Sequence, residues 1–343
     1  MKLAVVLFNL GGPDSPEAVE PFLRNLFSDS AIISLPAIFR LPLARLIARR
    51  RAPIARTIYG HIGGKSPIFE ETRKQADALE AVLSRDEVEA KAFVAMRYWH
   101  PFSDGAARAV KNFNPDKIVL LPLYPQYSTT TTASSLKDWA RAAKKAGLNA
   151  PTSRVCCYPW DEGFIAAATA KIREAMQGAP PGVSYRLLLS AHGLPRRVVQ
   201  KGDPYQWQVE QSAAAIVRAL GMPELEPVVC YQSRVGPLEW IGPATDAEIL
   251  RAGRDGKGVI LAPVAFVSEH SETLVELDIE YRKLAHEVPD YRRAATVGTQ
   301  TDFINGLAAL VRRALASKTV TCGPDPLGGG RICPADHKRC GYN

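Results

Sequence analysis

Short apolar segments alternate with amphipathic segments along almost the whole chain, and no other feature of the sequence restricts the fold as strongly. The apolar segments predict buried strands at residues 3–8, 90–96, 117–123, 153–158, 185–191, 227–231 and 258–265. The segments between them predict helices at residues 16–27, 68–84, 103–112, 135–146, 162–176, 205–220, 245–254, 269–286 and 302–317. Because such alternation is typical of a parallel sheet covered by helices, the sequence predicts an α/β fold.

A stretch rich in Gly and Pro, residues 178–182, divides the pattern. Strand–helix–strand units lie on both sides of it, which predicts two similar doubly wound lobes with a ligand cleft between them. We expect a first lobe over residues 1–150, a second lobe over 151–317 and a separate tail over 318–343. A chain of 343 residues is long enough for two domains of ordinary size, each with its own core.

No segment predicts export or insertion into a membrane. The apolar run at the start of the chain is short and leads into Asn9 and a Gly-Gly-Pro turn without a small-residue cleavage site, so we interpret it as the first strand. No run approaches the roughly 20 apolar residues that a spanning helix needs. We therefore expect a cytoplasmic protein or one that binds a membrane peripherally.

A stripe of carboxylates follows the last predicted strand. At about 100° per residue, one face of a helix carries four acidic side chains, Glu269, Glu272, Glu276 and Glu280. Such a stripe is commonly a solvated helix face. Here the helix follows a buried strand through a predicted N-cap, Ser268, and ligands of α/β sheets lie beyond the carboxyl ends of strands. With His270 beside it, the stripe could instead draw in a cation and take up protons.

A second candidate is His192, which stands at the end of a leucine-rich strand. Gly193 and Pro195 prevent the chain from continuing as strand or helix. A single histidine is often structural, but imidazole also suits proton transfer and metal ligation near neutral pH. If the two strands are neighbours, His192 faces the start of the glutamate stripe.

The strand ends of the first lobe carry glycines, aromatic residues and one arginine, Arg97. The Gly11-Gly12 pair lacks the G-x-G-x-x-G spacing of a dinucleotide site. The set suits a large planar ligand with carboxylates better than a nucleotide. In the second lobe, Trp240 lies in a loop bounded by Gly and Pro, where it either covers the core or packs against a flat apolar ligand.

The segment 32–56 is basic and apolar, and no acidic residue occurs between Asp29 and Glu70. Arginines interleaved with Ile, Leu and Phe can lie at an anionic membrane surface. The alternative is an amphipathic helix packed on the lobe with its arginines outward. The formal charge of +8, from 43 basic and 35 acidic residues, also permits a nucleic-acid partner, but no recognition motif accompanies it, so we predict none.

Three of the six cysteines, Cys322, Cys333 and Cys340, lie in the tail. In a cytosolic protein, cysteines indicate thiols, metal ligands or a cluster rather than structural disulfides. The tail is too rich in Gly and Pro to predict helix or sheet, so its order would have to come from a metal.

Taken together, several motifs resemble the ferrochelatase family, which acts last in haem synthesis. The matching segments are residues 9–13 (NLGGP), 63–67 (GGKSP), 97–101 (RYWHP), 124–128 (YPQYS), 190–195 (SAHGLP), 231–233 (YQS) and 268–281. The resemblance covers nearly the whole chain. It implies two Rossmann-like lobes with the active-site cleft between them, and a lyase that inserts Fe²⁺ into protoporphyrin IX with release of two protons.

The resemblance also assigns site residues. It makes His192 and Glu272 the catalytic pair that meets the iron, and it leaves open which is the base and which the metal ligand. Glu276 and Glu280 would continue an acidic path behind them. The porphyrin pocket would be lined by Leu10, Tyr59, Arg97, Tyr124 and Trp240. Metallation needs such groups, because two pyrrole protons must leave and the water shell of the iron must be replaced.

Many members of this family hold a [2Fe–2S] cluster, which implies Cys322, Cys333, Cys340 and either Cys157 or Cys156 as ligands, since such clusters take four thiolates. The tail spacing differs from the animal enzymes, which also have cysteine at the position of Thr129. A zinc site with His337, or no metal, is the alternative. The basic segment 32–56 would form an apolar lip over the pocket, with peripheral contact to the inner membrane.

Two other functions compete with this prediction: a chelatase for another tetrapyrrole or metal, as in cobalt or sirohaem pathways, and a haem- or metal-binding protein without turnover. The oligomeric state has no signal in the sequence.

Overall fold

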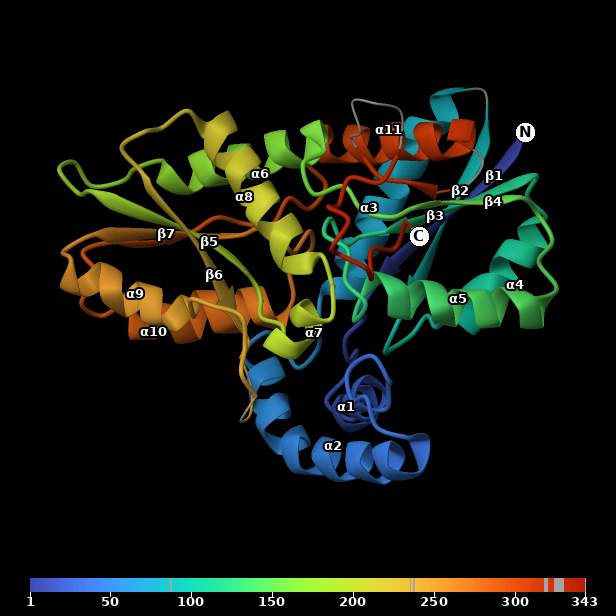
Figure 1. Cartoon of the computed structure of the whole chain (residues 1–343), viewed down its shortest axis with the longest axis horizontal. Coiled ribbons are helices and arrows are strands. Elements are labelled where there is room, and N and C mark those ends of the chain that lie inside the picture. Colours follow the sequence, from blue (N-terminus) through green and yellow to red (C-terminus); the bar gives the residue numbers. More distant parts are fainter. Residues whose placement is uncertain (87, 235, 237, 318–319, 324–329, 343) are drawn as a thin grey trace.

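Two parallel β-sheets lie side by side in the computed structural model, which describes residues 1–86, 88–234, 236, 238–317, 320–323 and 330–342 (Figure 1). The first sheet has the order β2-β1-β3-β4-β9 and contains β1 (Lys2–Asn9), β2 (Glu89–Met96), β3 (Lys117–Pro122), β4 (Thr152–Val155) and β9 (Val320–Thr321). The second has the order β6-β5-β7-β8 and contains β5 (Tyr185–His192), β6 (Glu226–Gln232), β7 (Gly258–Pro263) and β8 (Tyr291–Arg293). The predicted α/β fold with two parallel sheets is confirmed.

Helices cover both sheets on both faces (Figure 1). They are α1 (Val19–Phe27), α2 (Ala37–Gly60), α3 (Ile68–Leu83), α4 (Ser103–Phe113), α5 (Thr132–Ala146), α6 (Glu162–Met176), α7 (Arg196–Gln200), α8 (Tyr205–Leu220), α9 (Thr245–Arg254), α10 (Tyr281–Leu284) and α11 (Thr301–Ser317), with a π-helix at Glu272–Glu280. The short α7 and β8 were not predicted, because neither is long enough to show a periodic pattern.

Side chains of β1 alternate between two cores, which explains why this strand is apolar along its whole length. Leu3 and Val5 belong to a core that also contains residues of α3 and α11. Ala4 and Val6 belong to a second core that contains residues of α4 and α5.

One of these cores runs through both lobes. It joins Leu7 of β1 to Leu187 and Ile260 of the second sheet through α3, α6, α8 and α11. At Gly163, α6 approaches α11 so closely that a Cβ atom would lie 2.2 Å from the carbonyl oxygen of Asp302. The expectation that each lobe has its own core is therefore wrong on this side, because the two sheets share one layer of helices. On the opposite side the cores are separate.

The first sheet extends past residue 150, where the sequence places the end of the first lobe. β4 pairs with β3, and β9 of the tail pairs with β4. The prediction that the tail forms neither helix nor sheet is wrong for β9. A strand takes its hydrogen bonds from a neighbour, here the edge of β4, and local composition does not encode that neighbour. Tail residues 318–319, 324–329 and 343 lie outside the described part of the chain.

The basic and apolar segment forms mainly one helix, α2, which includes Pro42 and Pro53 and packs beside α1 (Figure 1). Ile38, Phe39 and Ile54 are 75%, 65% and 67% exposed. The alternative from the sequence, a helix packed on the lobe with its arginines outward, describes the buried alanines and exposed arginines of α2, and the helix exposes these three apolar side chains as well. In the described residues, no helix has both the length and the apolarity needed to cross a membrane.

Candidate functional site

His192 is the last residue of β5 and lies beside Gln232 of β6. Its Nδ1 is 2.6 Å from the carbonyl oxygen of Gly193. A carbonyl oxygen can only accept a hydrogen bond, so Nδ1 carries a proton and the neutral ring keeps its lone pair on Nε2. This Nε2 atom lies 3.8 Å from Oε2 of Glu272. The strand end therefore holds a basic nitrogen toward the carboxylate, as the sequence predicts.

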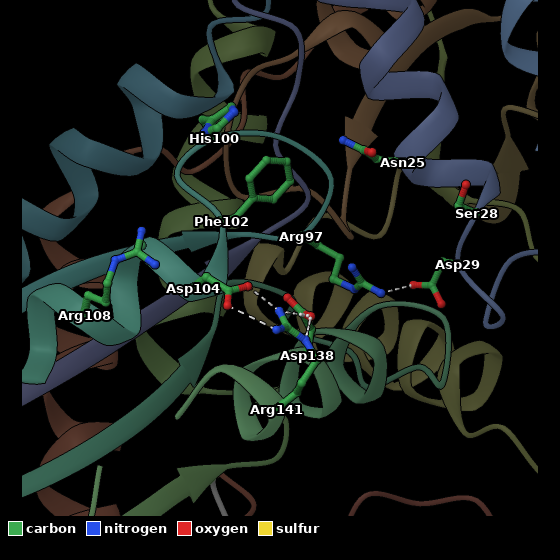
Figure 2. Close-up of a pocket in the computed structure, with 11 residues that line it drawn as sticks. Asn25, Ser28, Asp29, Arg97, His100, Phe102, Asp104, Arg108, Asp138 and Arg141 are labelled. Atoms are coloured by element: carbon green, nitrogen blue, oxygen red, sulfur yellow. Dashed lines mark hydrogen bonds and ion pairs between the residues drawn. The ribbon is translucent and has the colours of Figure 1, made fainter. Parts of the chain in front are cut away.

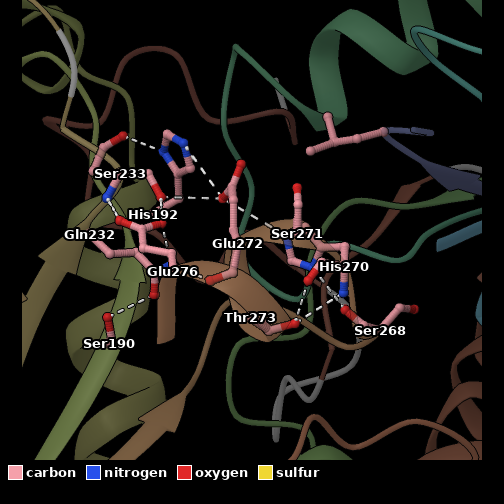
Figure 3. A network of polar contacts seen from close by, with 12 residues as sticks. Ser190, His192, Gln232, Ser233, Ser268, His270, Ser271, Glu272, Thr273 and Glu276 are labelled. Atoms are coloured by element: carbon pink, nitrogen blue, oxygen red, sulfur yellow. Dashed lines mark hydrogen bonds and ion pairs between the residues drawn. The ribbon is translucent and has the colours of Figure 1, made fainter. Parts of the chain in front are cut away.

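A second histidine, His270, approaches the same carboxylate oxygen (Figure 3). Its Nδ1 donates to the carbonyl oxygen of Ser268 at 3.0 Å, and its Nε2 lies 3.8 Å from Oε2 of Glu272. Glu272 thus lies between two imidazole Nε2 atoms. The sequence shows His270 beside the stripe, but its role was missed. Its position two residues before Glu272 was the available signal.

Glu272 and His270 each shift the pKa of the other. Partial burial raises the pKa of Glu272, but His192, His270 and the hydroxyl of Ser233 outweigh it, so the pKa falls to about 2. Burial lowers the pKa of His270, whereas the carboxylate of Glu272 raises it, and the net shift is upward. At neutral pH Glu272 is therefore an anion that can attract a cation.

Glu276 lies in the π-helix, four residues after Glu272, and accepts several hydrogen bonds. Ser233 donates to it from its backbone N–H at 2.8 Å and from its hydroxyl at 2.5 Å, and Tyr281 donates from its hydroxyl at 3.0 Å. Burial and the charge of Glu272 nevertheless raise the pKa of Glu276. Ser233 Oγ is also 3.5 Å from Oε2 of Glu272, so one hydroxyl connects the two carboxylates. Glu276 can hold a proton more easily than Glu272.

The glutamate stripe differs from its prediction in geometry. The expected α-helix over residues 269–286 is confirmed only at Tyr281–Leu284, because Glu272–Glu280 is a π-helix, with i to i+5 hydrogen bonds and a wider turn. Ser268 is not its N-cap, since its hydroxyl donates to Gln75 instead. Glu280 is exposed, while Glu269 points away and pairs with Arg293. Within the stripe, Glu272 and Glu276 are connected through the hydroxyl of Ser233.

Two of the predicted porphyrin-pocket residues lie close to this centre. Trp240 packs on Gly193, where an added Cβ atom would be 3.2 Å from its ring carbon Cε3. The Trp240 indole Nε1 is buried and has no hydrogen-bond partner among the described residues. Tyr59 of α2 approaches the hydroxyl of Ser271 at 3.4 Å, and burial raises its pKa to about 12.

The other predicted pocket residues belong to the first lobe. Leu10 is half-buried between two apolar clusters, and Tyr124 is buried in the core. Arg97 borders a cavity of about 480 Å³ (Figure 2). Its guanidinium pairs with Asp29 at 2.8 Å and donates to Ser134 at 2.7 Å. In the structure, this arginine is therefore held by a buried carboxylate.

Five buried cysteines gather where the tail meets β4, and none forms a disulfide: Cys156, Cys157, Cys322, Cys333 and Cys340. The Sγ atoms of Cys156, Cys157 and Cys322 lie within 4.8 Å of one another. The amide of Gln208 donates to Sγ of Cys157 at 3.3 Å and of Cys333 at 3.1 Å. Thiols that converge in this way fit the four thiolates of an iron–sulfur cluster.

Two other residues that the sequence analysis named for this site are His337 and Thr129. The ring of His337 lies 5.7 Å from that of Trp207, and His337 is not in the group of convergent ligands found among the described residues. Thr129 donates both its hydroxyl and its N–H to Asp203, at 2.6 and 2.7 Å. It thus has a structural partner where animal enzymes place a cysteine.

Comparison with known proteins identifies the family of this chain. The family model named Ferrochelatase matches residues 2–315. Ferrochelatases of Phenylobacterium zucineum and Caulobacter vibrioides are 56% and 54% identical, over 99% of this chain and 98% and 97% of their own lengths.

Among solved structures, SirB from Bacillus subtilis with Fe³⁺ shares the fold at a TM-score of 0.53 and 15% identity, over 93% of this chain and 98% of that one. The sirohydrochlorin chelatase SirB from Bacillus subtilis subspecies spizizenii, in complex with cobalt, has a TM-score of 0.54 at 13% identity, over 92% of this chain and 97% of that one. With the family model and the relatives in agreement over nearly its whole length, the chain belongs to the ferrochelatase family.

Proposed function

We propose that this member of the ferrochelatase family inserts Fe²⁺ into protoporphyrin IX at the site between His192, His270 and Glu272. The reaction forms protohaem, releases two protons and is the last step of haem biosynthesis. The observation that carries the assignment is the position of Glu272, whose Oε2 lies 3.8 Å from both Nε2 atoms. An anion between two imidazoles can pair with the incoming cation and with the protons that leave.

His192 suits the role of base. Its Nε2 has a free lone pair because Nδ1–H donates to Gly193, and its side chain is 37% exposed, so a proton can pass on to solvent. Glu272 suits the role of oxygen ligand or counter-charge, since a carboxyl with a pKa of about 2 binds protons weakly. We therefore assign the base to His192 and the metal ligand to Glu272 as part of the proposal.

Glu276 and Glu280 would form a path behind this centre. Glu280 is exposed, Glu276 is half-buried, and the hydroxyl of Ser233 connects Glu276 to Glu272. Carboxylate oxygens suit a hydrated Fe²⁺ that exchanges its waters stepwise, because they are anionic and hard. A raised pKa lets Glu276 take up one of the two released protons.

The porphyrin would lie over His192 with Trp240 against its apolar face. The Trp240 ring already packs on Gly193, next to the imidazole. Leu10 and Tyr59 would border the ligand from the first lobe. Arg97 and Tyr124 would support that side of the pocket, with Arg97 held in place by Asp29.

Cys157, Cys322, Cys333 and Cys340 would hold a [2Fe–2S] cluster. When bound, such a cluster supplies one-electron redox chemistry and cross-links the polypeptide. Here it would fasten the tail to the edge of β4. The two hydrogen bonds from Gln208 would stabilise negative charge on sulfur and favour Cys157 over Cys156 as the fourth ligand.

The α2 helix supports a peripheral membrane contact on the cytoplasmic side of the inner membrane. Ile38, Phe39 and Ile54 expose apolar surface on the same segment as six arginines, Arg40, Arg45, Arg49, Arg50, Arg51 and Arg56. Apolar side chains can enter the headgroup region while arginines pair with anionic lipids. Such a contact would suit delivery of a poorly soluble porphyrin.

The reaction is tested with purified protein, Fe²⁺ and protoporphyrin IX under anaerobic conditions. The free-porphyrin spectrum should be replaced by that of haem, and His192→Ala and Glu272→Ala should each remove turnover. His286→Ala, at an exposed histidine of the following segment, is the matched control and should turn over normally. Porphyrin binding without metallation would favour a binding protein. Near-normal turnover in either site variant would refute the assignment.

A further inference from the structure

We propose that Gln75, a residue of the first lobe, positions His270 in the second lobe, which makes the reaction centre depend on contact between the lobes. The inference rests on the proposed role of His270 beside Glu272. Gln75 lies in α3 and is fully buried. Among the described residues, its side chain forms hydrogen bonds with Val267 and Ser268, in the loop that leads into the π-helix, and with Gly298.

The orientation of the Gln75 amide is fixed by its partners. Nε2 donates to the carbonyl oxygens of Val267 at 2.7 Å and Gly298 at 2.9 Å. Oε1 accepts from the hydroxyl of Ser268 at 3.0 Å. Carbonyl oxygens cannot donate, so a flipped amide would lose both of these bonds. One side chain therefore holds both the backbone carbonyl of Val267 and the side chain of Ser268.

The carbonyl of Ser268 passes this constraint to His270. It accepts the Nδ1–H of the imidazole at 3.0 Å, which places the proton on Nδ1 and turns Nε2 toward Glu272 (Figure 3). A carbonyl that orients an imidazole in this way commonly sets its tautomer and its basicity. Gln75 thus acts through the Ser268 peptide, as a positioning residue that touches neither iron nor porphyrin.

A purely structural explanation is that Gln75 only ties the lobes together. The chain offers a matched comparison in Gln126, a buried glutamine after β3. Its amide donates to the hydroxyl of Ser212 at 2.8 Å and to the carbonyl of Val264 at 3.0 Å. It joins the same two lobes and reaches the same loop, but it forms no hydrogen bond with Ser268 or His270. Loss of either glutamine removes a similar set of buried hydrogen bonds.

The experiment compares Gln75→Leu with Gln126→Leu in the full-length protein. The midpoint temperature of thermal unfolding should fall by a similar amount in both variants. We expect Gln75→Leu to lower kcat by about 10- to 100-fold, the usual effect of removing an orienting partner, with the KM for porphyrin nearly unchanged. Gln126→Leu should lower kcat by less than about threefold, and on a His270→Gln background Gln75→Leu should add less than about twofold.

A second readout does not depend on activity. In protein labelled with ¹⁵N-histidine, the His270 ring should be an Nδ1–H tautomer, and Gln75→Leu should convert it to a mixture while Gln126→Leu leaves it unchanged. If Gln75→Leu does not fold, Ser268→Ala removes the bond to Oε1 alone and takes its place. An unchanged His270 tautomer, or equal kcat losses in the two glutamine variants, would overturn the proposal. If the tautomer shifts but no variant alters turnover, the role of His270 fails and the positioning by Gln75 stands.

Discussion

Replacing Arg97 by Met should destabilise the fold through the carboxylate that it leaves behind. Asp29 and Arg97 have side chains only 6% and 21% exposed, and their atoms approach to 2.8 Å. Removing one partner of a buried ion pair costs about 3–5 kcal/mol, because the remaining charge stays buried. Asp29 would keep hydrogen bonds from Ser134, Tyr98 and the N–H of Ala31. We therefore expect a smaller loss, about 2–3 kcal/mol of unfolding free energy.

Urea unfolding at neutral pH measures this loss. With an m-value of about 2–3 kcal/mol per M, the midpoint should fall by about 1 M. Arg73→Met is the control, because Arg73 forms an exposed pair with Asp77 in α3 and should cost less than about 0.5 kcal/mol. Equal midpoints for the two variants would refute the reasoning. The double variant Arg97→Met, Asp29→Asn should recover part of the loss, since no charge is then buried.

The same pair predicts a pH dependence. Burial raises the pKa of Asp29, but the hydrogen bonds from Ser134 and the N–H of Ala31, together with the charge of Arg97, lower it by more. The pKa of Asp29 in the folded protein is therefore below its usual value. A depressed carboxyl pKa contributes stability above the unfolded pKa of about 3.9, and this stability is lost as the pH falls through the folded pKa. Without Arg97 the folded pKa of Asp29 rises, so the variant should lose less stability than the wild type as the pH falls below about 4. Plots of unfolding free energy against pH for the two proteins should converge in acid, where Asp29 is protonated in both.

Two further predictions concern the cluster and the membrane. Cys333→Ser should lose iron and acid-labile sulfide after anaerobic purification, because a hydroxyl is a poor substitute for a thiolate. Cys230→Ser, at a buried cysteine outside the group, should keep both, and equal metal content in the two variants would exclude Cys333 as a ligand. Ile38→Asp should reduce flotation of the protein with vesicles of anionic lipid and leave the unfolding midpoint unchanged, since this side chain is 75% exposed. The control Phe69→Asp, also at an exposed apolar residue, should float with the vesicles to the same extent as the wild type.

Much of the reaction centre could be predicted from local patterns. His192 ends a leucine-rich strand, and Glu272 follows a buried strand, so both could be placed at the carboxyl edge of one sheet. The resemblance to ferrochelatases supplied their pairing. His270 was named beside the stripe but was not paired with Glu272. It precedes the π-helix, and only the structure shows that its Nε2 lies 3.8 Å from Oε2 of Glu272.

Contacts between distant segments could not be predicted. Gln75 and Val267 are 192 positions apart, and neither segment carries a pattern that names the other. Arg97 had the right residue type for a porphyrin carboxylate, but only the structure shows that it is held by Asp29. The cysteines of the tail and the two that follow β4 were grouped by resemblance alone, and the structure brings all five together.

The sequence by itself determined the periodic part of this protein: which segments are buried strands, which are helices, and which chemical groups stand at strand ends. These properties depend on the local order of apolar and polar residues, which the hydrophobic effect acts on directly. Only the tertiary structure decided that the lobes share a core, that the tail adds a strand to the first sheet, and that Glu272 lies between two imidazoles. Each of these depends on side chains far apart in the chain, whose hydrogen bonds and packing form only after the sheets have come together.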